Sequence, residues 1–273
     1  MKRPLQGFLV NAALVLIAVL TLAPLLWMVA ASLMPTGEAN TFPPRFWPSR
    51  PTLEHYRDLF TRLNLARYLL NTTIIATLSA AVSVLLNSLA GYAFAKLRFR
   101  GKGLVFQILL AALVIPPQVG MLPLFLMVKG LGLVNTWAAA VVPFMASVFG
   151  IFLIRQFAYA IPDDLLDAAR MDGASEFKIY TTIVLPLLRP ILVTLGVFVF
   201  LSAWNDFMWP LIVLSDEPKY TLPVALASLV GEHVQDTELM MAGSVLTVLP
   251  VLTVFVALQR FYMRGILMGG VKG

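Results

Sequence analysis

The sequence predicts an all-α membrane protein with six transmembrane helices. Hydrophobic residues make up 59% of the 273 residues, charged residues make up only 12%, and the mean hydropathy is +0.86. A chain of this composition lacks the polar surface that a soluble globule needs. Six apolar runs are each close to the length that crosses a hydrocarbon core of about 30 Å. We expect a single transmembrane domain over residues 1–273, with spans at about 8–34, 69–95, 104–128, 138–154, 191–214 and 240–259.

The first run has one feature of a secretory signal peptide, because Lys2 and Arg3 precede it. The small residues at 30–32 could also mimic a cleavage site. The run is longer than the usual apolar segment of a signal peptide. We therefore expect it to be retained as a membrane anchor.

The loop that follows, residues 35–68, begins with a proline-rich stretch, TFPPRFWPSRP, which favours extended backbone over helix. From Thr52 to Leu63 the apolar residues recur at helical spacing, which predicts a short amphipathic helix whose apolar side carries Leu53, Tyr56, Phe60 and Leu63. Either contact with an external protein or a cap over the helix bundle would explain such a helix.

Prolines interrupt the third predicted span at Pro116, Pro117 and Pro123, and the sixth at Pro250. Each proline removes a backbone donor and permits a kink. The fourth span is short, and it can be extended by residues 135–137.

Topology follows from the basic residues, which are enriched in cytoplasmic loops. If the N-terminus is cytoplasmic, thirteen of the 20 Lys and Arg residues lie on the cytoplasmic side. This arrangement places both termini and the loop 155–190 in the cytoplasm, with the loops 35–68 and 215–239 outside. The positive net charge therefore fits topology and lipid headgroups better than nucleic acid.

The cytoplasmic loop is polar and predicts a helix, a sharp turn and a second helix. Pro162 suits the start of a helix, and Asp163 and Asp164 favour its positive end. Gly173 predicts a left-handed residue that ends this helix, and Ser175 can cap the next. Such an ordered loop between membrane spans predicts docking to a soluble partner.

The loop resembles the "EAA" signature of permease subunits of bacterial ABC importers. The matching residues are Ala168, Ala169, Asp172, Gly173, Ala174, Ile183, Pro186 and Pro190. The stretches WNDFMWPL at 204–211 and GGVKG at 269–273 are similar to the maltose-type carbohydrate permeases. One residue departs from the family pattern, which usually has Glu where this chain has Asp167.

This resemblance implies a multi-pass permease of the bacterial inner membrane that imports a sugar or oligosaccharide. Implied partners are a second permease, two ATPase subunits, an external substrate-binding protein and membrane lipid, with ATP and Mg²⁺ bound by the ATPases. The chain itself would be neither an enzyme nor a cofactor-binding protein. A coupling helix between helices 4 and 5 would contact the ATPase through Asp167, Ala168, Ala169, Asp172, Gly173 and Ala174. The tail residues Gly269, Gly270 and Lys272 would reach toward the same interface.

Three residues near the end of the fifth span form a candidate substrate path: Trp204, Asn205 and Asp206. An acid at membrane depth has to face a cavity or a partner rather than lipid. The aromatic ring of Trp204 and the amide of Asn205 would suit binding of a sugar. Asn205 and Asp206 could instead tie helices together or cap a helix break near Pro210.

Other classes fit the sequence less well. There is no cysteine and there are only two histidines, His55 and His233, which makes a metal site or thiol catalysis a poor expectation. No glycine-rich phosphate loop is present, so nucleotide would bind another chain. An importer of glycerol phosphate or another polyol remains an alternative. An ion-coupled transporter would need more titratable groups in the spans, and a membrane enzyme would need a catalytic cluster.

Overall fold

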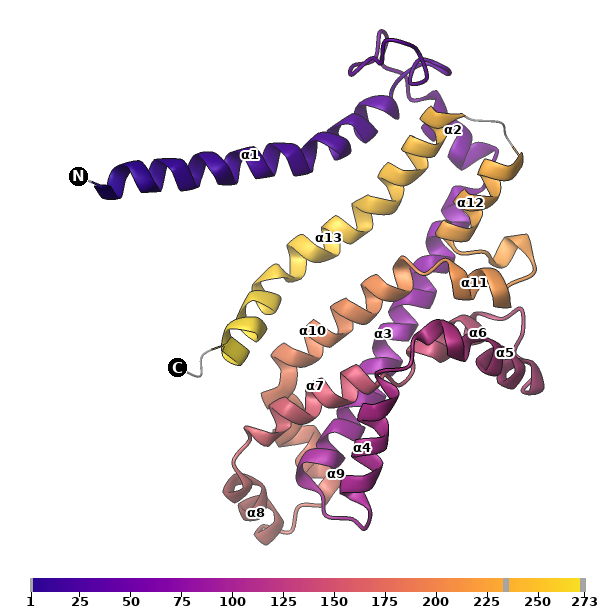
Figure 1. Ribbon diagram of the computed structural model, residues 1–273. Coiled ribbons are helices and arrows are strands. Elements are labelled where there is room, and N and C mark those ends of the chain that lie inside the picture. Colours follow the sequence, from indigo (N-terminus) through magenta and orange to yellow (C-terminus); the bar gives the residue numbers. More distant parts are fainter. Residues whose placement is uncertain (1, 233–235, 271–273) are drawn as a thin grey trace. The chain divides into compact units, whose positions relative to one another are not determined.

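The computed structural model describes residues 2–232 and 236–270, and these residues form helices without any strand. The chain divides into two compact units. Unit 1 comprises residues 1–67 and 225–250, and unit 2 comprises residues 68–224 and 251–273. Figure 1 shows the elements in chain order.

Unit 1 contains the long apolar helix α1 (Lys2–Ala31), the short helix α2 (Glu54–Thr61) and the first part of α13 (Thr237–Gly270). The amphipathic helix expected in this region is present as α2, but its buried residues are His55 and Leu59. Leu53 and Phe60, which we placed on the apolar side, are exposed. The buried side of α2 is therefore rotated from the one that the spacing suggested.

The loop between α1 and α2 is closed at its base by several hydrogen bonds. The backbone N–H of Thr52 donates to the carbonyl of Leu33 at 2.9 Å. The imidazole of His55 lies 2.9 Å from the carbonyl of Met34. At the far side of the loop, the backbone N–H of Ala39 donates to Glu238 of α13 at 2.7 Å. The loop is thus a folded part of unit 1.

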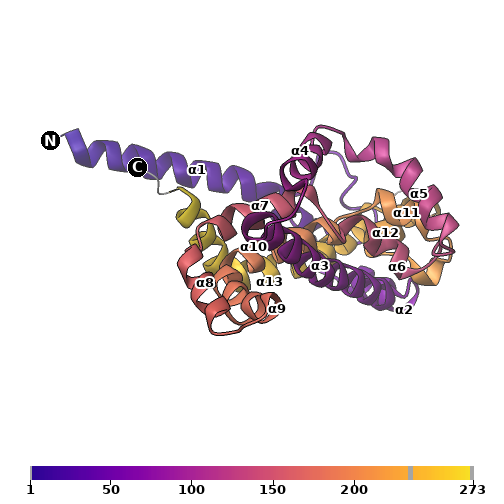
Figure 2. The ribbon, with the colours of Figure 1, turned by 90° about the horizontal axis from the view of Figure 1, so that it is seen from below.

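Unit 2 is built around α3 (Leu65–Lys96), α4 (Lys102–Ala112), α7 (Val148–Tyr159) and α10 (Leu185–Trp204). α7 packs against both α4 and α10. α8 (Asp163–Met171) and α9 (Glu176–Ile179) lie at one end of these helices, and Figure 2 looks at the unit from that end. At the other end lie α5 (Met121–Gly130), α6 (Trp137–Val141) and α11 (Met208–Val213).

The backbones of α3 and α7 approach closely at Gly91. A Cβ atom added to Gly91 would lie only 2.6 Å from two side-chain atoms of Ile154 and 3.0 Å from the backbone nitrogen of Arg155. Ile154 is fully buried at this crossing. Glycine is therefore required there for contact, as is common where membrane helices pack tightly.

Among the residues that the structure describes, four helices are long and apolar enough to cross a membrane: Gly7–Ala31, Leu65–Lys96, Glu176–Trp204 and Thr237–Ala257. Two bent pairs raise the number to as many as six if each pair is one span. The first pair bends by 103° between α4 and the segment Pro117–Gly130, next to Pro116 and Pro117, where the sequence predicts a break. The second pair, Trp137–Phe144 and Val148–Tyr159, bends by 48°. An all-helical membrane fold is confirmed, and the count of six spans stays a prediction.

The fifth expected span differs from the structure at both of its ends, and one further helix is present in the loop that follows it. α9 continues through a π-helical turn at Tyr180–Val184 into α10, so the fifth helix begins at Glu176, well before residue 191. This helix ends at Trp204, and α11 begins again at Met208. The loop 215–239 contains another apolar helix, α12 (Leu222–Glu232), which at 11 residues is too short to resemble a span.

Candidate functional site: the turn between α8 and α9

α8 begins directly after Pro162, whose backbone is extended (ψ 133°). The first turn of α8 carries Asp163 and Asp164, and its last turn carries Arg170. Acidic residues at the N-terminus and a basic residue at the C-terminus both interact favourably with the helix dipole. The local sequence thus sets the two ends of α8.

Gly173 makes the turn that follows α8. Its φ of +78° lies in the left-handed region, as the sequence predicts. The backbone N–H of Ala174 returns to the carbonyl of Ala169 at 3.0 Å, which closes the helix end. Ser175 then caps α9 by accepting a hydrogen bond from the backbone N–H of Lys178 at 3.3 Å. Helix, turn and helix are therefore confirmed at the expected residues.

Lys96, the last residue of α3, holds the start of α8. Its Nζ atom donates to Asp163 at 2.7 Å and to the carbonyl of Ile161 at 2.6 Å. The hydrogen bond from Lys96, with its positive charge, lowers the pKa of Asp163 below its usual range. The first turn of α8 is thus attached to α3 by an ion pair.

A chain of hydrogen bonds connects the exposed side of α8 to α3. Arg170 donates to Asp167 at 2.6 Å and, through Nε, to Glu176 Oε1 at 2.7 Å. Glu176 Oε2 in turn accepts a hydrogen bond from the hydroxyl of Tyr92 on α3 at 2.8 Å. The hydrogen bonds to Glu176 and Asp167 raise the pKa of Arg170, which stays charged. The carboxylate of Asp167 is therefore already engaged within the chain.

The underside of α8 packs against unit 2. Leu166 is buried, and it belongs to the same apolar cluster as Ile179 of α9 and Tyr180. Ala169 and Ala174 pack against this cluster and are partly buried. Ala168, in contrast, is exposed, so the two adjacent alanines lie on different sides of α8.

The outer surface of the turn combines apolar and acidic groups. Met171 is 88% exposed and Phe177 is 70% exposed. Leu165, Ala168, Asp172 and Gly173 are also exposed. A groove of about 810 Å³ lies beside this surface, lined by charged residues that include Lys96, Arg98, Asp167 and Glu176. Of the predicted coupling residues, Asp167, Ala168, Asp172 and Gly173 are thus exposed together, and Ala169 and Ala174 support them from below.

The three candidate residues of the substrate path lie at the end of α10, where each has a different environment. Trp204 is buried, with 1% of its surface exposed, and its ring stacks on Phe200 at 5.7 Å. Asn205 is exposed and donates to the carbonyl of Leu201 at 2.8 Å. Asp206 is half-buried and accepts a hydrogen bond from the backbone N–H of Trp209 at 3.4 Å, at the start of α11. The structure therefore gives Asp206 a capping contact at the helix break.

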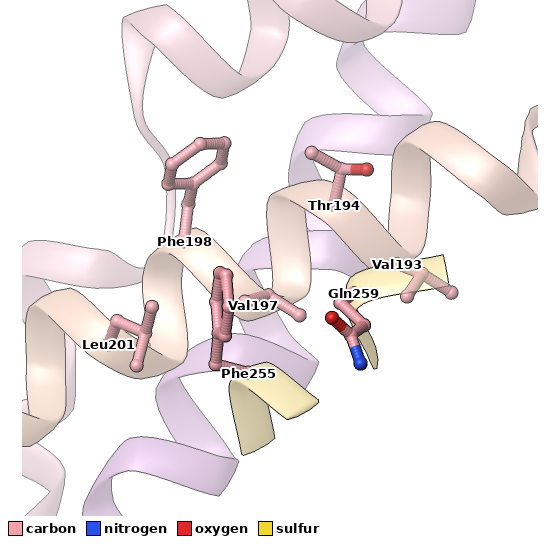
Figure 3. A pocket seen from close by; sticks show the side chains of 7 residues that line it. All are labelled: Val193, Thr194, Val197, Phe198, Leu201, Phe255 and Gln259. Atoms are coloured by element: carbon pink, nitrogen blue, oxygen red, sulfur yellow. The ribbon is translucent and has the colours of Figure 1, made fainter. Parts of the chain in front are cut away.

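A small apolar pocket of about 110 Å³ lies beside α10 (Figure 3). Phe255 and Gln259 of α13 line it together with five residues of α10, which include Thr194, Phe198 and Leu201. These three residues continue to Asn205 at four- and three-residue spacing, and so they share one face of the helix with it. This face carries no signal in the sequence, because its residues are typical of any membrane helix.

The C-terminal residues expected to reach a partner lie at the end of α13 or beyond it. Gly269 and Gly270 are the last residues of α13, whereas Lys272 lies outside the described residues, as does His233. Within residues 2–232 and 236–270, no group of three or more His, Cys, Asp or Glu side chains could hold a metal ion. The contacts of Tyr92 and Lys96 with the turn could not be predicted, because nothing in a single sequence links α3 to residues 67 to 84 positions later.

Known proteins match this chain along most of its length. Residues 84–267 match the family described as "Binding-protein-dependent transport system inner membrane component". The arabinooligosaccharides transport system permease protein AraQ of Halalkalibacterium halodurans is 36% identical, and the alignment covers 100% of both chains. The lactose transport system permease protein LacG of Rhizobium radiobacter is 33% identical over 100% of this chain and 98% of LacG.

A solved structure has the same fold. It is a chain of a bacterial ABC transporter involved in the import of the acidic polysaccharide alginate, with a TM-score of 0.80 and 25% sequence identity. The superposition covers 96% of this chain and 99% of that one. The helix order described above is thus shared by a transporter subunit of known structure.

Proposed function

This chain belongs to the family of binding-protein-dependent transport system inner membrane components, and from that premise we propose that it is a permease subunit of an ATP-driven ABC importer for a sugar or oligosaccharide. Relatives that align over the whole chain are named for arabinooligosaccharides and for lactose, and these names support a carbohydrate substrate. A second permease, two ATPase subunits and an external substrate-binding protein would complete the importer. ATP and Mg²⁺ would bind the ATPases.

The observation that carries this proposal is the outer surface of the α8–α9 turn. Met171 and Phe177 are large apolar side chains that remain exposed on a polar loop, which favours a contact with another protein. Asp164 and Asp172 lie exposed near them, so a partner groove with basic residues would complement this surface. The turn would lie on the cytoplasmic side, as would both chain termini.

Arg170 gives the docking surface a fixed shape. Because it binds both Asp167 and Glu176, it holds the exposed end of α8 against the start of α9. Asp167, Ala168, Asp172 and Gly173 would form the contact with the ATPase, and Ala169 and Ala174 would support it. The tail residues Gly269, Gly270 and Lys272 would contact the same partner.

The sugar path would pass the broken end of α10. Asn205 offers an exposed amide there, and Asp206 follows it at the break. Hydroxyl groups of a sugar need such donors and acceptors, whereas the buried ring of Trp204 would act by supporting the helix end.

A pull-down from native membranes tests the docking proposal. Tagged chain is extracted in mild detergent beside its Gly173→Arg variant, and the ATPase activity that copurifies is measured. We expect activity with the unchanged chain and its loss with the variant, because a bulky cation at the exposed left-handed turn would obstruct the partner. Gly103→Ala is the matched control, since a Cβ at Gly103 meets no atom within 4 Å.

Two outcomes would oppose the proposal. If intact chain brings down no ATPase activity, the protein works without an ATPase partner. If Gly173→Arg copurifies the ATPase and still supports normal uptake, docking does not occur through this turn. Immunoblotting of the membrane fraction confirms that the variant is present in equal amount.

A further inference from the structure

Three aromatic side chains lie exposed on the loop between α1 and α2. Phe42 is 96% exposed, Phe46 is 71% exposed and Trp47 is 75% exposed. We call these three residues the aromatic tip. All three lie within six residues of sequence, and exposed apolar surface concentrated in one place marks an interaction site, whereas single scattered apolar residues do not.

The aromatic tip is held in place by a buried acid. Glu38 is 8% exposed, and its Oε1 atom accepts a hydrogen bond from Arg45 at 2.7 Å. Its Oε2 atom accepts hydrogen bonds from Ser49, from the backbone N–H at 3.2 Å and from the hydroxyl at 3.1 Å. Burial alone would raise the pKa of Glu38, but the hydrogen bonds from Arg45 and Ser49 outweigh it and lower the pKa. Phe46 and Trp47 therefore lie between two residues that a single charged carboxylate fixes.

The contact of the loop with α1 indicates how deep the loop lies in the membrane. The indole N–H of Trp27, in α1, points to the backbone carbonyl of Arg45 at 3.4 Å. Trp27 lies four residues before the end of α1 at Ala31, which is about 6 Å along the helix axis. The apolar part of α1, Gly7–Ala31, has 25 residues and is therefore about 37 Å long, several ångströms more than a hydrocarbon core of about 30 Å. Trp27, and the backbone of Arg45 beside it, thus lie near the boundary between hydrocarbon and headgroups.

We propose that the aromatic tip is an interfacial anchor that inserts Phe46 and Trp47 into the lipid headgroup region beside the end of α1. Trp is enriched at this depth because its ring presents an apolar body with a polar N–H edge, and the phenyl ring of Phe46 adds apolar surface beside it. Arg45 and Arg50 lie on either side of Phe46 and Trp47. Arg45 is paired with Glu38, whereas Arg50 is exposed and its guanidinium group is suited to lipid phosphate. The partner of the aromatic tip is therefore the headgroup region of the bilayer.

The absence of cysteine from the sequence permits a direct test. Single cysteines are introduced as Phe46→Cys and Trp47→Cys, and each carries a nitroxide spin label. The full chain, with the subunits that copurify, is reconstituted into vesicles of phosphatidylcholine and phosphatidylglycerol. Accessibility to oxygen, which concentrates in lipid, is compared with accessibility to a water-soluble nickel complex. Glu54→Cys on α2 is the matched control, because Glu54 is exposed on the same unit and carries the charge least suited to anionic lipid.

We expect oxygen to be favoured over nickel several-fold at positions 46 and 47, and the reverse preference at position 54. If nickel is favoured at 46 and 47 as strongly as at 54, the aromatic tip faces water and the proposal is wrong. If the labels face water in the vesicles and lose contact with both reagents when a substrate-binding protein is added, the surface binds protein and the proposal is also wrong. Agreement between two neighbouring positions guards against a local effect of one substitution.

Discussion

The hydroxyl of Tyr92 donates a hydrogen bond to the carboxylate of Glu176, 2.8 Å away, across 84 residues of sequence. Tyr92 is buried in the membrane helix α3, whereas Glu176 begins α9 at the exposed turn. Through Arg170 this bond extends to Asp167 on the outer surface of α8. A continuous set of hydrogen bonds thus joins the proposed docking surface to a helix that is long and apolar enough to cross the membrane.

Replacement of Tyr92 by Phe removes this hydrogen bond and keeps the ring. Because Glu176 is charged but partly exposed, we expect a loss of about 1 kcal/mol in the attachment of the turn to α3. The substrate transported per ATP hydrolysed should fall roughly several-fold, while the partner ATPase still copurifies. Uptake and hydrolysis measured together in proteoliposomes give this ratio.

Tyr180→Phe is the control for this prediction. Tyr180 is buried in the same apolar cluster, and its hydroxyl forms a 2.7 Å hydrogen bond with Ser88. That bond has no connection to the charged residues of α8. An equal fall in the coupling ratio for both variants would show that general loosening of the cluster, and not the Glu176 contact, is responsible.

Gly91→Ala should destabilise the protein, because its Cβ would overlap Ile154 and press on the backbone of α7. Overpacking of this kind costs about 1–3 kcal/mol. We expect a lower midpoint of thermal unfolding for the detergent-purified chain. Gly103→Ala, which adds a methyl group in open space, should leave the midpoint unchanged or slightly higher. Equal midpoints for the two variants would mean that α3 and α7 do not pack as closely as described.

Asp206→Ala separates the capping role of Asp206 from a role in the sugar path. Loss of a capping contact alone costs about 1 kcal/mol, which leaves most of the protein folded. If Asp206 also contacts substrate, uptake should fall more than membrane abundance. Asp206→Asn keeps an acceptor for the backbone of Trp209, so it should restore abundance fully. If uptake and membrane abundance fall by the same factor, Asp206 has a structural role and does not contact the substrate.

The ion pair of Asp163 with Lys96 should make the start of α8 sensitive to acid. Its hydrogen bond from Lys96 lowers the pKa of Asp163 from the ordinary value of 3.8. A carboxylate with a lowered pKa in the folded state stabilises that state above its ordinary pKa, and the stabilisation disappears as pH falls through the lowered pKa. The unfolding midpoints of unchanged chain and Asp163→Asn should therefore differ by a constant amount from pH 8 to about 5, and the difference should shrink as the pH falls below 3.8 and vanish below the lowered pKa of Asp163. A gap that persists at the lowest pH would exclude this ion pair as its source.

The sequence predicted the α8–α9 turn well because each signal there is local. Asp163 and Asp164 at the helix start, Gly173 in the left-handed turn and Ser175 as a cap all depend on neighbours within a few residues. The break near Pro116 and Pro117 was also predictable, because proline cannot donate a helical hydrogen bond.

Contacts between distant segments could not be predicted in the same way. The spacing of Asp167 and Arg170 suggests an ion pair on one helix face, but nothing local indicates that Arg170 also binds Glu176. The links from Tyr92 and Lys96 depend on how α3 packs. α12 was not predicted because its 11 residues, most of them apolar, lie between acidic segments and are too few for a membrane span. The rotation of α2 follows from the hydrogen bond of His55 to Met34, which buries a residue that we had not counted as apolar.

The continuity of α9 with α10 has a mechanical consequence. A helix of 29 residues from Glu176 to Trp204 is about 43 Å long, and the docking turn lies at one end while Asn205 lies at the other. If it pivots near the docking turn, a tilt of about 5° moves the far end by roughly 4 Å. A small rotation at the turn would therefore move the other end of the helix, where a sugar would pass, by about the width of one side chain.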